Sequence, residues 1–130
     1  MENEKVSPSV DLPILYSCSG CSSAGQMANT LALRMDRERL AEMSCIAGIG
    51  GDVPTLMRKA RSGKPLLVID GCPLHCALHS LRQRELKPDR HVDLSRLGVA
   101  KEGRQNFSQE QASRLYGQVT QELGRSALRP

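Results

Sequence analysis

The chain is poor in aromatic residues: its 130 positions hold no tryptophan, two tyrosines and one phenylalanine. So few rings leave no stacking platform for single-stranded nucleic acid. The net charge of +4 comes from lysines and arginines scattered between acidic and apolar positions, a pattern typical of solvated helix faces. Nucleic acid is therefore not an expected partner.

Long apolar runs are also absent. The longest, residues 66–69, is far shorter than the roughly 20 residues that a membrane span requires. Residues 1–10 include charged side chains and no apolar stretch, so we expect no secretory signal, no membrane partner and a cytoplasmic location. Residues 1–11 are predicted to be a flexible lead-in, and residues 12–130 a single α/β domain with one core.

Four apolar runs, at residues 13–16, 43–47, 66–69 and 92–94, are each followed by a turn and a helical period. The unbroken run at 66–69 is typical of a strand covered on both faces of a parallel sheet. The alternation predicts a three-layer α/β sandwich around a four-stranded, mainly parallel sheet. By analogy with doubly wound sheets we expect the strand order 2-1-3-4, with a ligand site at the carboxyl ends where the order reverses.

The helices have sequence markers of their own. We expect a first helix over residues 24–35 and a second helix capped by Asp52. A third helix should begin at Pro73, with Leu74, Leu78 and Leu81 facing inward. The last helix should extend from a Ser108–Gln111 capping box to Gly124. The glycines at 48–51 lack the lysine of a phosphate loop and the third glycine of a dinucleotide fingerprint. They are interpreted as a tight turn rather than as an anion-binding loop.

Cysteine is the unusual component. Five cysteines in a short chain with cytosolic features indicate metal ligands or redox thiols rather than disulfides. Cys18 and Cys21 follow the first predicted strand, and Cys72 and Cys76 follow the third. Neighbouring strands lie about 5 Å apart, so adjacency of the first and third strands would bring both pairs to the switch point of the sheet.

The spacing within each pair suits a metal ion. Two residues between Cys18 and Cys21, one of them Gly20, let both sulfurs turn to one side of a tight loop. Cys72 and Cys76 would lie one turn apart on a helix face. Four thiolates suit a closed tetrahedral Zn²⁺ site, and an iron–sulfur cluster is an alternative that the sequence does not separate from it. Thiol–disulfide exchange or metal transfer through the same cysteines also stays open.

The remaining candidate residues have competing interpretations. We expect Cys45 in the core, with the switch point as its alternative. We expect His79 on an exposed helix face, with a role as substitute ligand or as hydrogen-bond donor to a ligand as its alternative. Asp70 could accept hydrogen bonds from loop amides, act as an acid or base beside the metal, or simply form a turn. We expect His91 in a surface turn.

Two motifs together carry a family resemblance. They are Cys18-Ser19-Gly20-Cys21 and Asp70-Gly71-Cys72-Pro73-Leu74-His75-Cys76. From about residue 12 to about residue 123 the chain resembles the DGC-domain family, small bacterial and archaeal domains named for the central Asp-Gly-Cys and described as zinc-binding. The resemblance implies that Cys18, Cys21, Cys72 and Cys76 chelate the metal. It implies no particular reaction, so whether the protein is an enzyme stays open.

Overall fold

A four-stranded, all-parallel sheet forms the centre of the molecule. The computed structural model describes residues 11–127, with side chains described through residue 124, so residues 1–10 of the predicted lead-in lie outside the described part. The strands are β1 (Ile14–Ser17), β2 (Glu42–Met43), β3 (Leu66–Asp70) and β4 (Arg90–Asp93). They pair in the order β2-β1-β3-β4, which confirms the predicted order.

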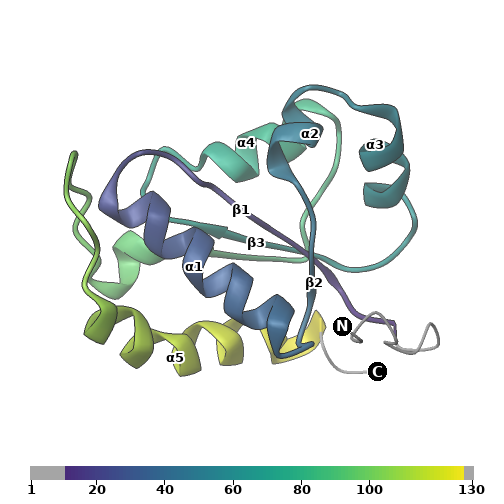
Figure 1. Ribbon diagram of the computed structural model, residues 1–130. Coiled ribbons are helices and arrows are strands. Elements are labelled where there is room, and N and C mark those ends of the chain that lie inside the picture. The colour runs from purple at the N-terminus through teal and green to yellow at the C-terminus, as the bar shows by residue number, and fades with distance from the viewer. Residues whose placement is uncertain (1–10, 128–130) are drawn as a thin grey trace.

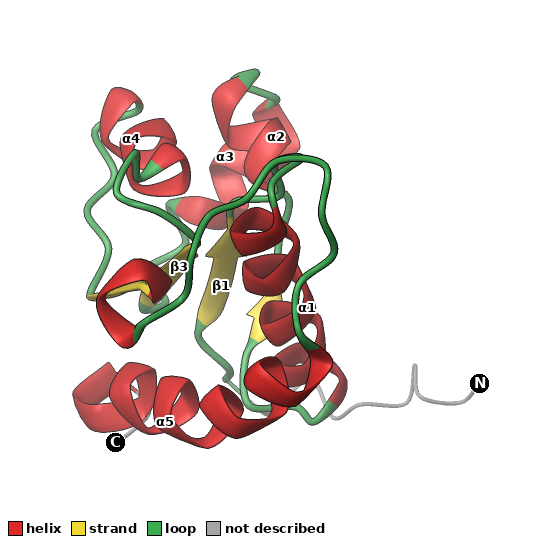
Figure 2. Ribbon diagram, turned by 90° about the vertical axis from the view of Figure 1, so that its left-hand side faces the viewer, coloured by secondary structure: helices red, strands yellow, loops and turns green. Residues whose placement is uncertain are grey.

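Helices cover both faces of this sheet. They are α1 (Ser23–Arg37), α2 (Ile46–Gly50), α3 (Pro54–Ala60), α4 (Cys76–Gln83), the 3-10 helix η2 (Leu94–Leu97) and α5 (Gln109–Ala127). Figures 1 and 2 show α2, α3 and α4 on one side of the sheet and α1 and α5 on the other. The predicted three-layer α/β sandwich is confirmed.

The side chains of β3 alternate between two hydrophobic clusters. Leu67 and Ile69 pack with α1 and α5, whereas Leu66 and Val68 pack with α2, α3 and α4. Every residue of β3 is buried, as its unbroken apolar run predicts. Burial of such a side chain contributes about 1.5–3 kcal/mol to folding, so β3 is a principal source of stability. In the described part of the chain, no helix is both long enough and apolar enough to cross a membrane.

The second apolar run departs from the prediction. Only Glu42 and Met43 form a strand, and Ile46 begins a short helix, α2, in place of a longer strand and a tight turn. Close packing accommodates this short helix: a Cβ atom at Gly48 would lie 2.0 Å from the side chain of Leu56. Gly48 therefore allows α2 to approach α3 closely, which a sequence pattern does not reveal.

The starts of α3 and α4 also differ from the prediction. Asp52 adopts a left-handed conformation with φ of 58°, so it lies in the turn before α3 and does not cap the helix. Val53 is the N-cap residue and makes no side-chain capping bond. Helix α4 begins at Cys76 rather than at Pro73, which leaves Leu74 in a turn with 61% of its surface exposed instead of facing the core.

The last helix follows its predicted pattern closely. The backbone N–H of Gln111 donates to Ser108 Oγ at 3.0 Å, as in the expected capping box. The Gln111 side chain does not complete that box, because its amide donates to the carbonyl of Gly98 at 3.4 Å. Helix α5 continues past Gly124 to Ala127.

Candidate metal centre

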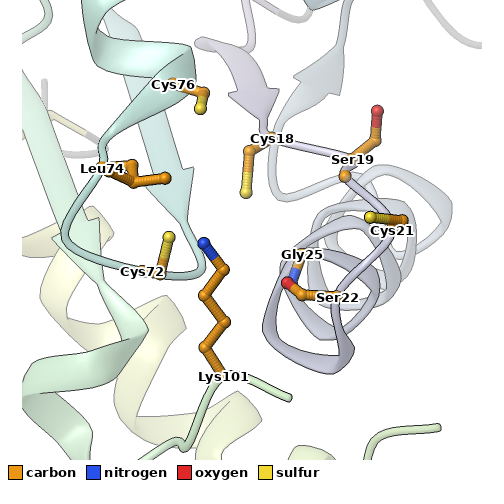
Figure 3. A pocket seen from close by; sticks show the side chains of 10 residues that line it. Cys18, Ser19, Cys21, Ser22, Gly25, Cys72, Leu74, Cys76 and Lys101 are labelled. Atoms are coloured by element: carbon orange, nitrogen blue, oxygen red, sulfur yellow. The ribbon is translucent and has the colours of Figure 1, made fainter. Parts of the chain in front are cut away.

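A pocket of about 370 Å³ opens at the carboxyl ends of β1 and β3. Its lining includes all four cysteines of the predicted site, together with small residues of the loops and one lysine. The lining residues are Cys18, Ser19, Gly20, Cys21, Ser22, Gly25, Cys72, Leu74, Cys76 and Lys101. Figure 3 shows the side chains around the common space. The structure thus brings the two cysteine pairs together at the switch point of the sheet.

Two hydrogen bonds hold Cys18 at the end of β1. Its backbone N–H donates to the carbonyl of Ile69 at 3.2 Å, which extends the β1–β3 pairing by one step. Its Sγ accepts a hydrogen bond from the backbone N–H of Gly71 at 3.1 Å. Burial raises the pKa of the Cys18 thiol to about 11, and the hydrogen bond from Gly71 offsets only part of that rise. In the metal-free protein Cys18 is therefore a protonated thiol near neutral pH.

The loop that carries Cys21 folds back onto the first turn of α1. Ser22 caps the helix, since its Oγ accepts a hydrogen bond from the N–H of Gly25 at 3.1 Å. The side chain of Gln26 donates to the carbonyl of Gly20 at 2.7 Å. A Cβ atom at Gly25 would lie 2.9 Å from the backbone nitrogen of Gly20, so the fold requires glycine there. The loop is held in place while the Cys21 thiol stays exposed.

Gly71 brings the second cysteine segment against the first. A Cβ atom at Gly71 would lie 2.4 Å from the carbonyl oxygen of Ala24, in the first turn of α1. Such a close approach of two backbones is possible only for glycine. The end of β3 therefore touches the start of α1, and Cys72 enters the same pocket as Cys21.

Asp70 fixes the loop between Cys72 and Cys76. This aspartate is 1% exposed, and its oxygens accept hydrogen bonds from the N–H groups of Ala77 at 2.9 Å and Leu78 at 3.1 Å. It thereby caps α4 from the preceding strand, which supports the interpretation of Asp70 as an acceptor of backbone hydrogen bonds. Cys72 lies in the loop and Cys76 at the first position of α4, so the prediction that both lie on one helix face is wrong.

Two histidines near this loop are each hydrogen-bonded to an aspartate. His91 Nε2 is hydrogen-bonded to Asp70 Oδ2 at 2.9 Å, and His75 Nε2 to Asp93 Oδ2 at 2.8 Å. The two rings meet edge to face with centroids 4.6 Å apart. The prediction of a surface turn for His91 is wrong, because the residue lies on β4 and its ring faces the buried carboxylate of Asp70.

The backbone of His75 and the charge of its partner Asp93 both depart from the ordinary. His75 adopts a left-handed conformation, with φ of 54° and ψ of 48°, in the turn that connects Cys72 to Cys76. Burial acts against the charge of Asp93, but hydrogen bonds from Ser95 and His75 outweigh it and lower the pKa of this carboxyl. An ionised Asp93 thus anchors His75, and through it the cysteine loop, to β4.

The four thiols line one pocket, but their present positions are too far apart to hold a metal ion. In residues 11–127, no three Cys, His, Asp or Glu side chains are grouped closely enough to hold a metal ion as they stand. Figure 3 shows the sulfur atoms of Cys18, Cys21 and Cys72 directed toward the shared space. The side chains fit a thiophilic ion in their chemistry, since sulfur atoms from two segments line one pocket.

Three further residues complete the comparison with the sequence. Cys45 is exposed at the N-cap of α2, so its predicted place in the core is wrong, and it is not among the pocket-lining residues. His79 is exposed on α4, as expected. Lys101 lines the pocket from the loop between η2 and α5 and was not predicted, because nothing in its local sequence links it to the cysteines.

These features define a small α/β protein with a cysteine-lined pocket at the switch point of a parallel sheet. The chain belongs to the DGC-domain family, since the family model described as "DGC domain" matches residues 14–119. It is similar to the "Anaerobic and virulence modulator AnvM" of Pseudomonas aeruginosa strain PAO1, with 54% identity over 110 residues that cover 85% of this chain and 84% of the relative. No solved structure matches the chain.

Proposed function

We propose that this protein is a metal-binding module that holds one thiophilic ion, Zn²⁺ in the first place, through Cys18, Cys21, Cys72 and Cys76. The supporting observation is that these four cysteines, from two distant segments, line one pocket that contains no carboxylate or imidazole among its lining residues. A pocket with sulfur as its only strong donor favours zinc or iron–sulfur over magnesium or calcium, which prefer oxygen ligands.

A turn of the exposed cysteine side chains toward the pocket would complete the centre. Cys18 is held by the Gly71 N–H, whereas the side chains of Cys21 and Cys76 are exposed and can turn toward the pocket. The backbone of the Cys21 loop is held by the hydrogen bond from Gln26 to the Gly20 carbonyl, so the adjustment would fall on the exposed Cys21 side chain. When bound, Zn²⁺ would supply a compact positive charge that holds the thiolates of these four cysteines together.

Binding releases protons, because only the thiolate form of cysteine is a strong ligand. Cys18 contributes to this release, since burial raises the pKa of its thiol to about 11 in the metal-free protein. The apparent affinity for zinc should therefore increase with pH. Such a thiol set requires a reducing environment, which is why we place the protein in the cytoplasm.

A regulatory use of this site is favoured over a metabolic one. Four thiolates around zinc leave no open position where water could be activated. The relative is named an anaerobic and virulence modulator, and we extend the general role of modulator to this chain. Loading or loss of the metal would be the event that changes the state of the protein.

Thiol–disulfide exchange is the second candidate function. It is favoured by the exposure of Cys21 and Cys76, which leaves one thiol of each pair accessible to an oxidised partner. In this function the protein would contain a reversible Cys18–Cys21 or Cys72–Cys76 disulfide that thioredoxin or glutathione reduces. Mass spectrometry of the protein during such cycles would detect either disulfide, and the absence of both would exclude this function.

Elemental analysis of protein purified without oxygen tests the metal site. We expect about one zinc per chain in the wild-type protein, and almost none in a Cys72→Ser, Cys76→Ser double variant. Cys45→Ser is the matched control, because it removes an exposed thiol that does not line the pocket. Iron with visible absorption would assign a cluster instead of zinc. Metal-free wild-type protein, or equal metal in the double variant, would overturn the proposal.

A further inference from the structure

We infer that Lys101 is the charge-compensating residue of the metal centre, a positioning residue whose ammonium group stabilises the thiolate–metal complex. The inference rests on the proposed function and adds to it a residue outside the cysteine motifs. Although Lys101 is exposed, its side chain lines the cysteine pocket, and Figure 3 shows its nitrogen directed into the space between Cys18 and Cys72.

The backbone on both sides of Lys101 is tied to the start of α1. The Oγ of Ser23 donates to the carbonyl of Ala100 at 3.3 Å and accepts a hydrogen bond from the N–H of Glu102 at 3.0 Å. The N–H of Ser23 donates in turn to the carbonyl of Glu102 at 2.8 Å. Because Ser23 is buried and follows Cys21 by two residues, these bonds hold Lys101 beside the cysteine loop.

The ammonium group of Lys101 has no partner of its own within the described residues. By contrast, the ammonium groups of Lys59 and Lys64 both form ion pairs with Glu42. The residues around Lys101 in the pocket are cysteines, serines, glycines and one leucine, so no carboxylate neutralises it there. An unpaired cation directed between Cys18 and Cys72, in a pocket that four cysteines line, is a specific arrangement, unlike that of a lysine paired on the surface.

The negative charge of the expected zinc–thiolate complex explains why a cation beside the cysteines would favour metal binding. A Zn²⁺ ion with four thiolates has a net charge of −2, whereas four protonated thiols are neutral. The ammonium of Lys101 therefore attracts the loaded site much more strongly than the empty one, and this difference adds to the affinity for the metal. The same attraction holds the thiolates in place in the loaded site.

Zinc affinity, measured by competition with a chelator, tests this role with a set of four proteins. They are the wild type, Lys101→Met, Lys101→Arg and the control Lys87→Met, which removes the same charge from an exposed position outside the pocket. We expect zinc binding about tenfold weaker in Lys101→Met at low salt, and close to wild type in Lys101→Arg and Lys87→Met. Near 1 M salt, where the screening length is about 3 Å, the defect of Lys101→Met should shrink to about twofold.

The outcomes separate this inference from the proposed function. Equal zinc affinity in the wild type and Lys101→Met, a defect in Lys101→Arg as large as that in Lys101→Met, or a defect that salt does not change would overturn the role of Lys101 while the cysteine site stands. A wild-type protein that takes up no zinc would overturn both.

Discussion

A hydrogen bond of 3.1 Å connects the backbone N–H of Gly71 to the Sγ of Cys18, two residues separated by 53 positions in the chain. It joins the Asp-Gly-Cys segment after β3 to the first cysteine segment after β1. An N–H donor beside sulfur favours the thiolate over the thiol, so the bond prepares Cys18 for a metal even though burial opposes its ionisation. The predictions below test the contacts that create this arrangement.

Replacement of Gly71 by alanine should destabilise the protein. The new Cβ atom would lie 2.4 Å from the carbonyl oxygen of Ala24, so β3 and α1 must separate. We expect the free energy of unfolding to fall by about 1–3 kcal/mol, as for other overpacked sites, and metal content to fall with it. Gly20→Ala is the control, since a Cβ there meets nothing within 4 Å. Equal stability of the two variants in urea denaturation would show that this close approach is unimportant.

Asp70→Ala should be among the most destabilising substitutions in the chain. It removes a buried carboxylate that accepts hydrogen bonds from the amides of Ala77 and Leu78 and is also bonded to His91. Buried groups left without a partner cost about 1–3 kcal/mol each, so we expect a loss of about 3 kcal/mol or more. Asp52→Asn, at an exposed left-handed turn position, should change stability little. Thermal unfolding of the two variants gives the comparison.

His75 should matter more than His79, although both lie near Cys76 in the sequence. His75→Ala removes the hydrogen bond to Asp93 and leaves a mostly buried carboxylate with fewer partners, at a cost of about 2 kcal/mol. His79 is exposed, so His79→Ala should stay within about 0.5 kcal/mol of the wild type. Chemical denaturation would measure both values. If the two substitutions had the same effect, the Asp93–His75 anchor would contribute nothing.

Titration of Cys18 should lower the stability of the metal-free protein in alkali. Burial, the largest cause, raises the pKa of this thiol from 9.0 to about 11 in the folded state. The unfolded chain therefore loses the proton at a lower pH than the folded chain does. The stabilisation is complete below about pH 9 and is lost as the pH rises through about 11.

Urea denaturation at about pH 8 and about pH 10 would measure this loss in the wild type and in Cys18→Ala. The fall in unfolding free energy between the two conditions should be smaller in the variant. Comparison of the differences, rather than of the absolute stabilities, removes the cost of the cavity that alanine leaves. An equal fall in both proteins would assign the alkaline loss to other groups, such as Tyr116, whose pKa burial raises to about 12.

The parts of the fold with strong sequence periodicity were predictable. The unbroken apolar run of β3 and the helical spacing in α1 and α5 left few alternatives, and the strand order followed from the rule for doubly wound sheets. The convergence of the cysteines followed from that order. It needed no knowledge of side-chain contacts, because parallel strands end at the same edge of the sheet.

The features that were missed depend on contacts between distant segments. The run at residues 43–47 is too short for periodicity to separate a strand from a helix, and the close packing of Gly48 on Leu56 that accommodates α2 is not visible in the local sequence. The start of α4 depends on Asp70, a cap supplied by the preceding strand. Lys101 reaches the cysteines only because Ser23 holds its loop. None of these partners is adjacent in the sequence.

Cys45 has a practical consequence for work with this protein. Its exposed thiol stands at the start of α2, apart from the lining of the cysteine pocket. An ion that occupied the four pocket thiols would leave this fifth one open to air oxidation and to maleimide dyes. Two copies of the chain can therefore be cross-linked through Cys45, and a probe attached there would report on the protein without touching the pocket.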